Sequence, residues 1–270
     1  MNKPRLDVLV VGATGSIGRL VVAEALRQGH GVRALVRSPE KALHLPERAK
    51  AFVGDLTQPG TLADAVKDIG AVVFTHGSDG GGKRGSETVD FGGVRNILHA
   101  LGPNRPRVAL MTAIGVTDRL GSYNRSTEAH DWKRRGERLV RAGGYPYTIV
   151  RPGWFDYNGA DEHKLVFLQG DTRHAGNSSD GVIARQQIAE VLVASLTTKE
   201  ALRKTFELVA VKGQAQRDLG PLFAALTPDA AGSLDGVRDM ANMPLADEPG
   251  HVRKELEAFQ ERAAVKSEDK

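Results

Sequence analysis

The stretch VLVVGATGSIG, residues 8–18, decides the fold. Its first four residues are uninterrupted apolar ones, which is typical of a strand buried on both faces of a parallel sheet. A glycine-rich turn follows at once, and residues 17–28 then show the apolar spacing of a helix. A turn of this kind lets a diphosphate approach bare backbone, and the helix N-terminus offers free N–H groups. We therefore predict a dinucleotide phosphate site here, with an ordinary helix-capping turn as the alternative. The residues expected to form it are Gly12, Thr14, Gly15, Ser16, Ile17 and Gly18.

Downstream of this turn, apolar runs alternate with helical patterns. Strands are predicted at 32–36, 51–53, 71–75, 107–112 and 147–150, and helices at 61–67, 86–101 and 127–142. Such alternation implies crossover connections and a Rossmann-type α/β fold with a doubly wound parallel sheet. After Pro152 the pattern loosens, with a helix at 182–196, a strand at 205–211 and a last helix at 251–263. We expect a single domain over residues 1–270. Its cofactor-binding core would span 6–153, and a small C-terminal lobe, 154–265, would lie over the carboxyl edge of the sheet.

Composition excludes several classes of protein. The 270 residues contain 37 Lys and Arg against 33 Asp and Glu, a net charge of +4 that indicates neither a nucleic-acid nor a membrane partner. Cysteine is absent, so disulfides, thiolate metal sites and cysteine nucleophiles are excluded. No group of His, Asp and Glu has metal-ligand spacing, and we expect no metal. The four apolar residues before Gly12 are too few for a signal-peptide core, so we expect a cytoplasmic protein.

The end of the second predicted strand indicates which cofactor is bound. An NAD site usually places Asp or Glu there, on the ribose 2′-hydroxyl. Here the strand ends with Arg37 and Ser38. Because a guanidinium can pair with a 2′-phosphate, we predict NADP(H) over NAD(H), the alternative being that Arg37 is a solvated charge. Asp55, followed by Leu56, is placed to accept from the adenine amino group, or equally to cap the next helix.

Taken together, these segments resemble the atypical short-chain dehydrogenase/reductases, and among them the NAD(P)H-binding, NmrA-like and flavin-reductase-like proteins. The resemblance lies in the glycine turn, the Val-Arg pair at 36–37, Gly-Asp-Leu at 54–56 and YTIVRPG at 147–153. It implies a Rossmann-type fold, NADP(H) binding, and a nicotinamide near the ends of the fourth, fifth and sixth strands. The residues expected around that ring are Thr75, His76, Gly77, Thr112, Lys133, Pro152, Gly153 and Trp154.

The usual catalytic tyrosine of this family has no counterpart here. Short-chain dehydrogenases use a tyrosine, a lysine four residues later and a serine, and the lysine lowers the tyrosine pKa. Lys133 stands in the lysine position, but Ala129 stands in the tyrosine position. Thr112 keeps a hydroxyl near the serine position. His130 and Tyr123 are candidate substitute acids, although a surface histidine is the plainer interpretation of His130.

Two hypotheses follow for the function. The first is an NADP(H)-dependent oxidoreductase that reduces a small acceptor: a planar flavin or quinone, or a carbonyl compound. The second is a non-catalytic NADP(H)-binding sensor or regulatory protein. Epimerase-type chemistry ranks last, because it also needs the tyrosine. In either case the expected partner is a small molecule, and the sequence leaves a homo-oligomer open.

Overall fold

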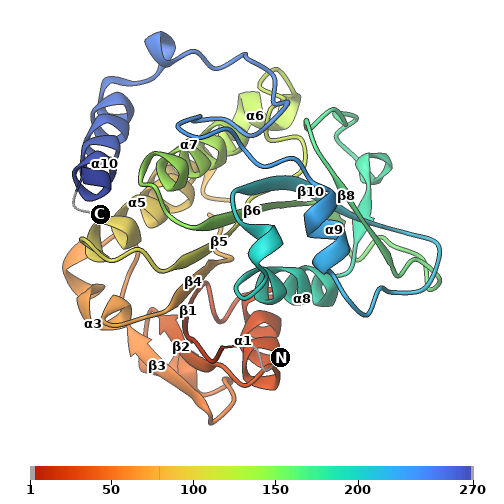
Figure 1. The fold of residues 1–270 in the computed structure, drawn as a ribbon, viewed down its shortest axis with the longest axis horizontal. Coiled ribbons are helices and arrows are strands. Elements are labelled where there is room, and N and C mark those ends of the chain that lie inside the picture. The colour runs from red at the N-terminus through yellow and green to blue at the C-terminus, as the bar shows by residue number, and fades with distance from the viewer. Residues whose placement is uncertain (1–3, 79, 269–270) are drawn as a thin grey trace.

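The computed structural model describes residues 4–78 and 80–268 and is built around a ten-stranded sheet. The strands that run parallel are β1 (Asp7–Val11), β2 (Gly31–Val36), β3 (Ala49–Val53), β4 (Ala71–Phe74), β5 (Arg107–Met111), β6 (Tyr147–Pro152) and β10 (Lys204–Val211). Their spatial order is β3-β2-β1-β4-β5-β6-β10 (Figure 1). This is the predicted doubly wound parallel sheet.

The order of the strands reverses direction at β1. In register, Val8 pairs with Val32 of β2 on one side and with Ala71 of β4 on the other. Residues 8–11 are wholly buried, as expected for a strand covered on both faces. Connections leave β1 and β4 toward opposite sides, and a crevice forms outside the carboxyl ends of these strands.

Helices cover both faces of the sheet (Figure 1). One face carries α1 (Gly18–Arg27) and α8 (Arg185–Ser195), whose side chains share a buried apolar cluster with β1. The other face carries α3 (Ala63–Val66), α5 (Gly92–Ala100), α7 (Ala129–Ala142) and α10 (Gly250–Glu268). There Ile97, Leu139 and Phe259 lie in a second buried cluster, so α10 completes the layer started by α5 and α7.

Shorter elements link this frame. They are α2 (Pro39–Ala42), α4 (Gly82–Gly85), α6 (Ser122–Thr127) and 3-10 turns at Pro59–Thr61, Ser178–Asp180, Lys199–Ala201 and Leu245–Asp247.

Two predicted helices begin differently from our expectation. The helix at 86–101 starts with a π-helical turn, Ser86–Phe91, before α5. The helix at 127–142 starts at Ala129, because Glu128 takes a left-handed backbone (φ +54°) that separates α6 from α7.

The chain after β6 extends the sheet further than the sequence indicated. β7 (Trp154–Phe155) and β9 (Val182–Ile183) prolong it, and β8 (Lys164–Leu168) pairs antiparallel with β10. The prediction of a helix from 182 was wrong at its start: 182–183 are strand, and α8 begins at Arg185. The short helix α9 (Gly220–Ala225) packs beside β8, and residues 226–249 then run irregularly to α10. Within the described part of the chain, no helix combines the length and apolarity needed to cross a membrane.

Candidate functional site

A cleft of about 910 Å³ opens where the carboxyl ends of β1, β2, β4 and β5 meet. It lies at the point where the strand order reverses, which is where ligands bind in open α/β sheets. Fourteen of the residues selected from the sequence line it: Gly12, Thr14, Gly15, Ser16, Ile17, Arg37, Asp55, Leu56, Thr75, His76, Gly77, Thr112, Tyr123 and Lys133. Segments far apart in the chain are thus brought to one surface.

The glycine turn is shaped by close backbone contacts. Gly12 has φ +84°, and a Cβ there would lie 2.8 Å from the backbone N of His76. A Cβ on Gly18 would lie 2.0 Å from the carbonyl O of Gly12, so only glycine lets α1 approach β1 this closely. Gly18 is buried and is not among the described residues that line the cleft. The Gly15 N–H donates to the Gly12 carbonyl over 2.9 Å and closes the turn.

A cation that the sequence did not indicate lies beside this turn. Nε of Arg185, the first residue of α8, donates to Oγ of Ser16 over 3.2 Å. The same guanidinium pairs with Asp156. Arg185 is 169 positions from Ser16 in the sequence, and no local pattern links the two. Only the packing of α8 against α1 brings it here.

Arg37 is exposed and lines the end of the cleft nearest β2. Asp55 Oδ1 accepts from both N and Oγ1 of Thr57, each at 2.8 Å. These hydrogen bonds, with a smaller effect of Arg37, hold the pKa of Asp55 below its usual value. Asp55 therefore stabilises the local turn at Thr57, whereas the N-cap of the following 3-10 turn is Gln58 and that of α3 is Leu62. The expected helix-capping role of Asp55 is not seen, and its contact with the adenine stays a prediction. Ser38 lies just before α2, outside the lining of the cleft.

At the opposite end, Lys133 is engaged by a buried carboxylate. Its Nζ lies 2.5 Å from Oδ1 of Asp90, and Oδ2 of Asp90 accepts from Oγ of Ser78 over 2.7 Å. Asp90 lies on the π-helical turn, a distortion often found at functional sites. Neither Asp90 nor Ser78 was selected from the sequence, although both line the cleft. Asp90 is 43 positions from Lys133 in the sequence, so no local spacing pattern connects the two residues.

His76 lines the cleft close to this pair and is a neutral group. Burial lowers the pKa of its ring to about 4, despite the nearby carboxylate of Asp90. Its Nε2 is 3.1 Å from the carbonyl of Val89. Thr75 beside it donates its hydroxyl to the carbonyl of Val11 over 3.0 Å, tying β4 to β1. The shape of this wall is therefore fixed by hydrogen bonds to backbone.

The hydroxyl of Thr112 is already used within the protein. It donates to Oε1 of Glu137 over 2.7 Å, and Glu137 Oε2 is 2.7 Å from Nη2 of Arg151. Although burial alone would raise it, the pKa of Glu137 is pulled down to about 2 by Arg151 and Arg141. The Thr112 hydroxyl therefore donates its hydrogen bond to the buried cluster of Glu137 and Arg151 and is not free to donate to a ligand.

The two candidate acids occupy different places. Tyr123 is 56% exposed and lines the cleft. His130 packs against the Tyr123 ring (centroids 5.2 Å apart) and lies outside the described lining. Burial lowers the pKa of His130, and its Nδ1 has no hydrogen-bond partner among the described residues. His130 is half-buried, so it is neither a fully exposed surface histidine nor part of the described cleft lining.

The segment expected beside the nicotinamide is only partly at the cleft. Pro152 and Gly153 are buried, and a Cβ on Gly153 would lie 2.4 Å from the carbonyl O of Gly181. Trp154 is exposed and meets Tyr157 edge-on. Of this segment, Phe155 is among the described residues that line the cleft, and Pro152, Gly153 and Trp154 are not. In residues 4–78 and 80–268, no group of three His, Asp or Glu side chains is arranged to hold a metal ion.

A glycine turn between β1 and α1, with the cleft at the reversal of strand order, defines a dinucleotide-binding protein of Rossmann type. The model of the NAD(P)H-binding family matches residues 12–199, more than half of the chain, so the chain belongs to this family. The predicted fold class and the resemblance to atypical short-chain dehydrogenase/reductases are confirmed.

Named relatives are similar over most of the chain. Sanguinarine reductase of Eschscholzia californica is 26% identical, covering 84% of this chain and 98% of that protein. The photosystem II assembly factor Ycf39 of Cyanophora paradoxa is 28% identical, covering 82% of this chain and 69% of its own length. Among solved structures, a putative NAD-dependent epimerase/dehydratase from Bacillus halodurans has a TM-score of 0.67 at 24% identity, covering 81% of this chain and 99% of that one.

Proposed function

We propose that this protein is an NADP(H)-dependent oxidoreductase that transfers a hydride to a small acceptor. The observation that carries the proposal is a single cleft lined by the glycine turn, by Arg37 at the end of β2 and by Lys133 of α7. Family membership supports the dinucleotide, and the similarity to a plant reductase supports the class of reaction. A cytoplasmic location stays a prediction.

The residues of the cleft fit NADP(H). The bare backbone at Gly12 and Gly15 leaves room for a diphosphate, and α1 begins with no acidic residue in its first turn. Arg185 adds a positive charge beside Ser16, which favours the same group. Arg37 would pair with the 2′-phosphate, and Lys133 would hydrogen-bond the nicotinamide ribose. When bound, the cofactor would supply the hydride.

The acceptor class follows from the proton donors at hand. Ala129 occupies the place of the usual tyrosine, and Lys133 is already paired with Asp90. A flavin or quinone can take its proton from solvent, so a cleft with few acids would serve it. A carbonyl acceptor would need Tyr123, the phenol that lines the cleft. We therefore rank flavin and quinone acceptors ahead of carbonyl compounds.

A second candidate is a non-catalytic NADP(H) sensor. It is favoured by the Thr112 hydroxyl, which is bound to Glu137 and so withheld from a substrate. One relative is named as an assembly factor rather than as a reductase. This candidate requires cofactor binding without turnover.

Calorimetry followed by a turnover assay tests both candidates. We expect NADPH to bind more tightly than NADH, and NADPH absorbance to fall when a flavin or quinone is added. Binding without turnover on any flavin, quinone or aldehyde would support the sensor. Absence of heat with either dinucleotide would refute both.

A further inference from the structure

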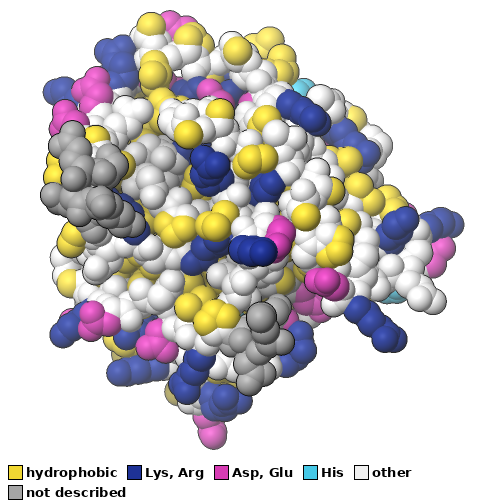
Figure 2. Space-filling model, viewed as in Figure 1, with side chains coloured by type: hydrophobic (Ala, Val, Ile, Leu, Met, Phe, Trp, Pro, Cys, Tyr) yellow, Lys and Arg dark blue, Asp and Glu magenta, His cyan; other side chains and the backbone are white. Residues whose placement is uncertain are grey.

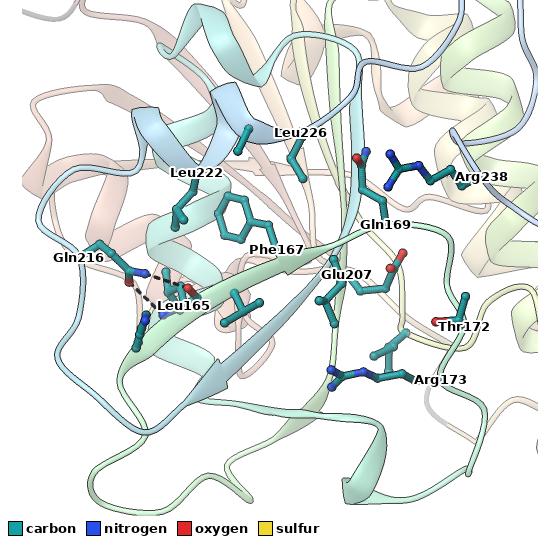
Figure 3. Close-up of a pocket in the computed structure, with 15 residues that line it drawn as sticks. Leu165, Phe167, Gln169, Thr172, Arg173, Glu207, Gln216, Leu222, Leu226 and Arg238 are labelled. Carbon is teal, nitrogen blue, oxygen red and sulfur yellow. Dashed lines mark hydrogen bonds between the residues drawn. The ribbon is translucent and has the colours of Figure 1, made fainter.

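A second cavity, of about 610 Å³, lies at the far edge of the sheet between β8, β10 and α9 (Figure 3). Its volume is within the range of small-molecule sites. Among the described residues, none lines both this cavity and the dinucleotide cleft. The proposed function leaves this cavity without a role.

One end of the cavity is mainly apolar, and the Gln216 amide there is hydrogen-bonded to the backbone of Leu165. Phe167 of β8 and Leu222 of α9 face each other there, with Leu226 behind them (Figure 3). The Phe167 ring stacks on the buried ring of Phe206, with centroids 4.3 Å apart, so its position is fixed. This end offers a preformed surface for a hydrocarbon or aromatic group.

The other end is charged. Arg173 and Arg238 line it, on either side of Glu207 in the view of Figure 3. Arg173 uses one N–H to bind the carbonyl of Asp180, and Arg238 forms no hydrogen bond or ion pair within the described chain. The backbone of Arg238 is left-handed (φ +66°), a conformation that non-glycine residues adopt rarely and that recurs in ligand clamps. Both arginines are exposed, and each guanidinium keeps N–H donors that no described residue accepts.

Glu207 is the weakly paired carboxyl of a buried charged cluster. Its Oε1 is 3.4 Å from Nη1 of Arg151, whereas Arg151 makes 2.7 Å contacts to both Glu137 and Asp239. Its Oε2 accepts from the backbone N of Asp171 over 3.2 Å. Burial raises the pKa of Glu207 to about 7, with Asp171 and Asp239 adding to the rise and Arg151 opposing it. Near neutral pH this carboxyl is partly protonated, so it can donate a hydrogen bond to an anion.

We propose that this cavity binds a small amphipathic carboxylic acid, with its apolar body on Phe167 and Leu222 and its carboxylate at the end that holds Arg173 and Arg238. The two guanidinium groups, neither of which pairs with a carboxylate of the described residues, select for an anion, and the apolar end requires a hydrocarbon or aromatic body. The site is independent of the dinucleotide cleft and does not rest on the proposed reaction.

Titration of the full-length protein with decanoate, followed by calorimetry, tests this site. We expect saturable binding at one site, with the same affinity in the absence of NADPH and at saturating NADPH. Decylammonium, which has the same chain and the opposite charge, should bind at least tenfold more weakly. Displacement of decanoate by NADPH, or equal binding of decylammonium, would overturn the proposal, as would no binding.

Substitutions locate the site. The double variant Arg173→Gln with Arg238→Gln should weaken decanoate binding about tenfold or more, as expected for lost charge-assisted hydrogen bonds. The matched control is Arg48→Gln with Arg217→Gln, which removes two exposed charges outside the cavity lining. An equal loss in the control would mean that the effect is only one of net charge, and the proposal would fail.

The pH dependence gives an independent check. Ionised Glu207 would repel the bound carboxylate, so affinity should be highest below pH 7 and fall as pH rises through about 7. The charged groups that face Glu207 are Arg151 of β6, Asp171, Asp239, and the two cavity arginines, with Glu137 of α7 on the far side of Arg151. Glu207→Gln should flatten the profile while keeping the binding. A profile unchanged in this variant would remove Glu207 from the site.

Discussion

Lys133 and Asp90 form a hydrogen-bonded ion pair at the wall of the dinucleotide cleft, with 2.5 Å between Nζ and Oδ1. The Asp90 side chain is 2% exposed, and that of Lys133 is 20% exposed. The positive charge that Lys133 presents to the cleft is therefore partly compensated by the carboxylate of Asp90. This differs from an arrangement in which a lysine lowers the pKa of a neighbouring tyrosine, since Ala129 offers no phenol here.

Breaking this pair from one side should cost more than removing both partners. Lys133→Met leaves a buried carboxylate without its cation, and we expect the free energy of unfolding to fall by about 3 kcal/mol. Lys133→Met combined with Asp90→Asn should recover most of that loss. Urea denaturation of the two single variants and the double variant measures the coupling. Additive losses would show that the two side chains act independently.

Arg37 and Arg185 are predicted to have separable effects on cofactor binding. Arg37→Asp should weaken NADPH binding by about 1.5–3 kcal/mol and leave NADH nearly unchanged, because only NADPH carries the 2′-phosphate. Arg185→Gln should weaken both dinucleotides alike, because Arg185 lies beside Ser16 in the diphosphate turn. Calorimetric titration of each variant with NADPH and with NADH distinguishes the effect of Arg37 from that of Arg185. Unchanged discrimination in Arg37→Asp would remove Arg37 from the site.

Alanine substitutions at Gly18 and at Gly15 should have different effects. A Cβ on Gly18 meets the Gly12 carbonyl at 2.0 Å, so Gly18→Ala should lower the free energy of unfolding by roughly 1–3 kcal/mol. At Gly15 the nearest atom is the same carbonyl at 3.2 Å, and the backbone is not left-handed. Gly15→Ala should therefore fold nearly as well as the parent but bind NADPH more weakly. Thermal denaturation with and without NADPH tests both expectations.

The glycine turn could be predicted because its determinants are consecutive residues. Local patterns also located the parallel strands and Arg37. In contrast, Arg185 and Asp90 reach the cleft only through the packing of α8 on α1 and of the π-helical turn on α7. β8 escaped prediction because an edge strand paired only with β10 shows neither the spacing nor the flanking turn of a crossover unit.

The charges of α7 show the same limit. The sequence places Arg134 and Arg135 directly after Lys133. In the structure both are buried, and Arg134 and Arg138 reach Asp235, at 3.1 and 2.7 Å. The partner lies about a hundred residues away, in the irregular segment 226–249, so the helix alone gave no sign that it would be covered. Burial of an arginine depends on a distant carboxylate that spacing cannot reveal.

Tyr123→Phe should separate the acceptor classes. If a carbonyl compound is reduced, loss of the phenol should lower kcat about a hundredfold or more, since general acid catalysis contributes that much. Reduction of a flavin, which draws its proton from solvent, should change less than twofold. Steady-state assays with both acceptors on the same preparation provide the comparison. A large loss with flavin would mean that Tyr123 positions the acceptor instead of protonating it.

Two buried groups should make stability depend on pH in opposite senses. His76 has its folded-state pKa lowered to about 4 from 6.5, so its contribution is complete above pH 6.5 and is lost as pH falls toward 4, by up to about 3 kcal/mol. Glu207 has its folded-state pKa raised to about 7 from 4.5, so its contribution is complete below pH 4.5 and is lost as pH rises toward 7. His76→Gln should therefore leave a protein whose stability falls more steeply between pH 4.5 and 7, whereas Glu207→Gln should leave one whose stability rises over that window. Urea midpoints measured at closely spaced pH values test this. Parallel curves for the two variants would show that neither group titrates in the folded protein as its burial implies.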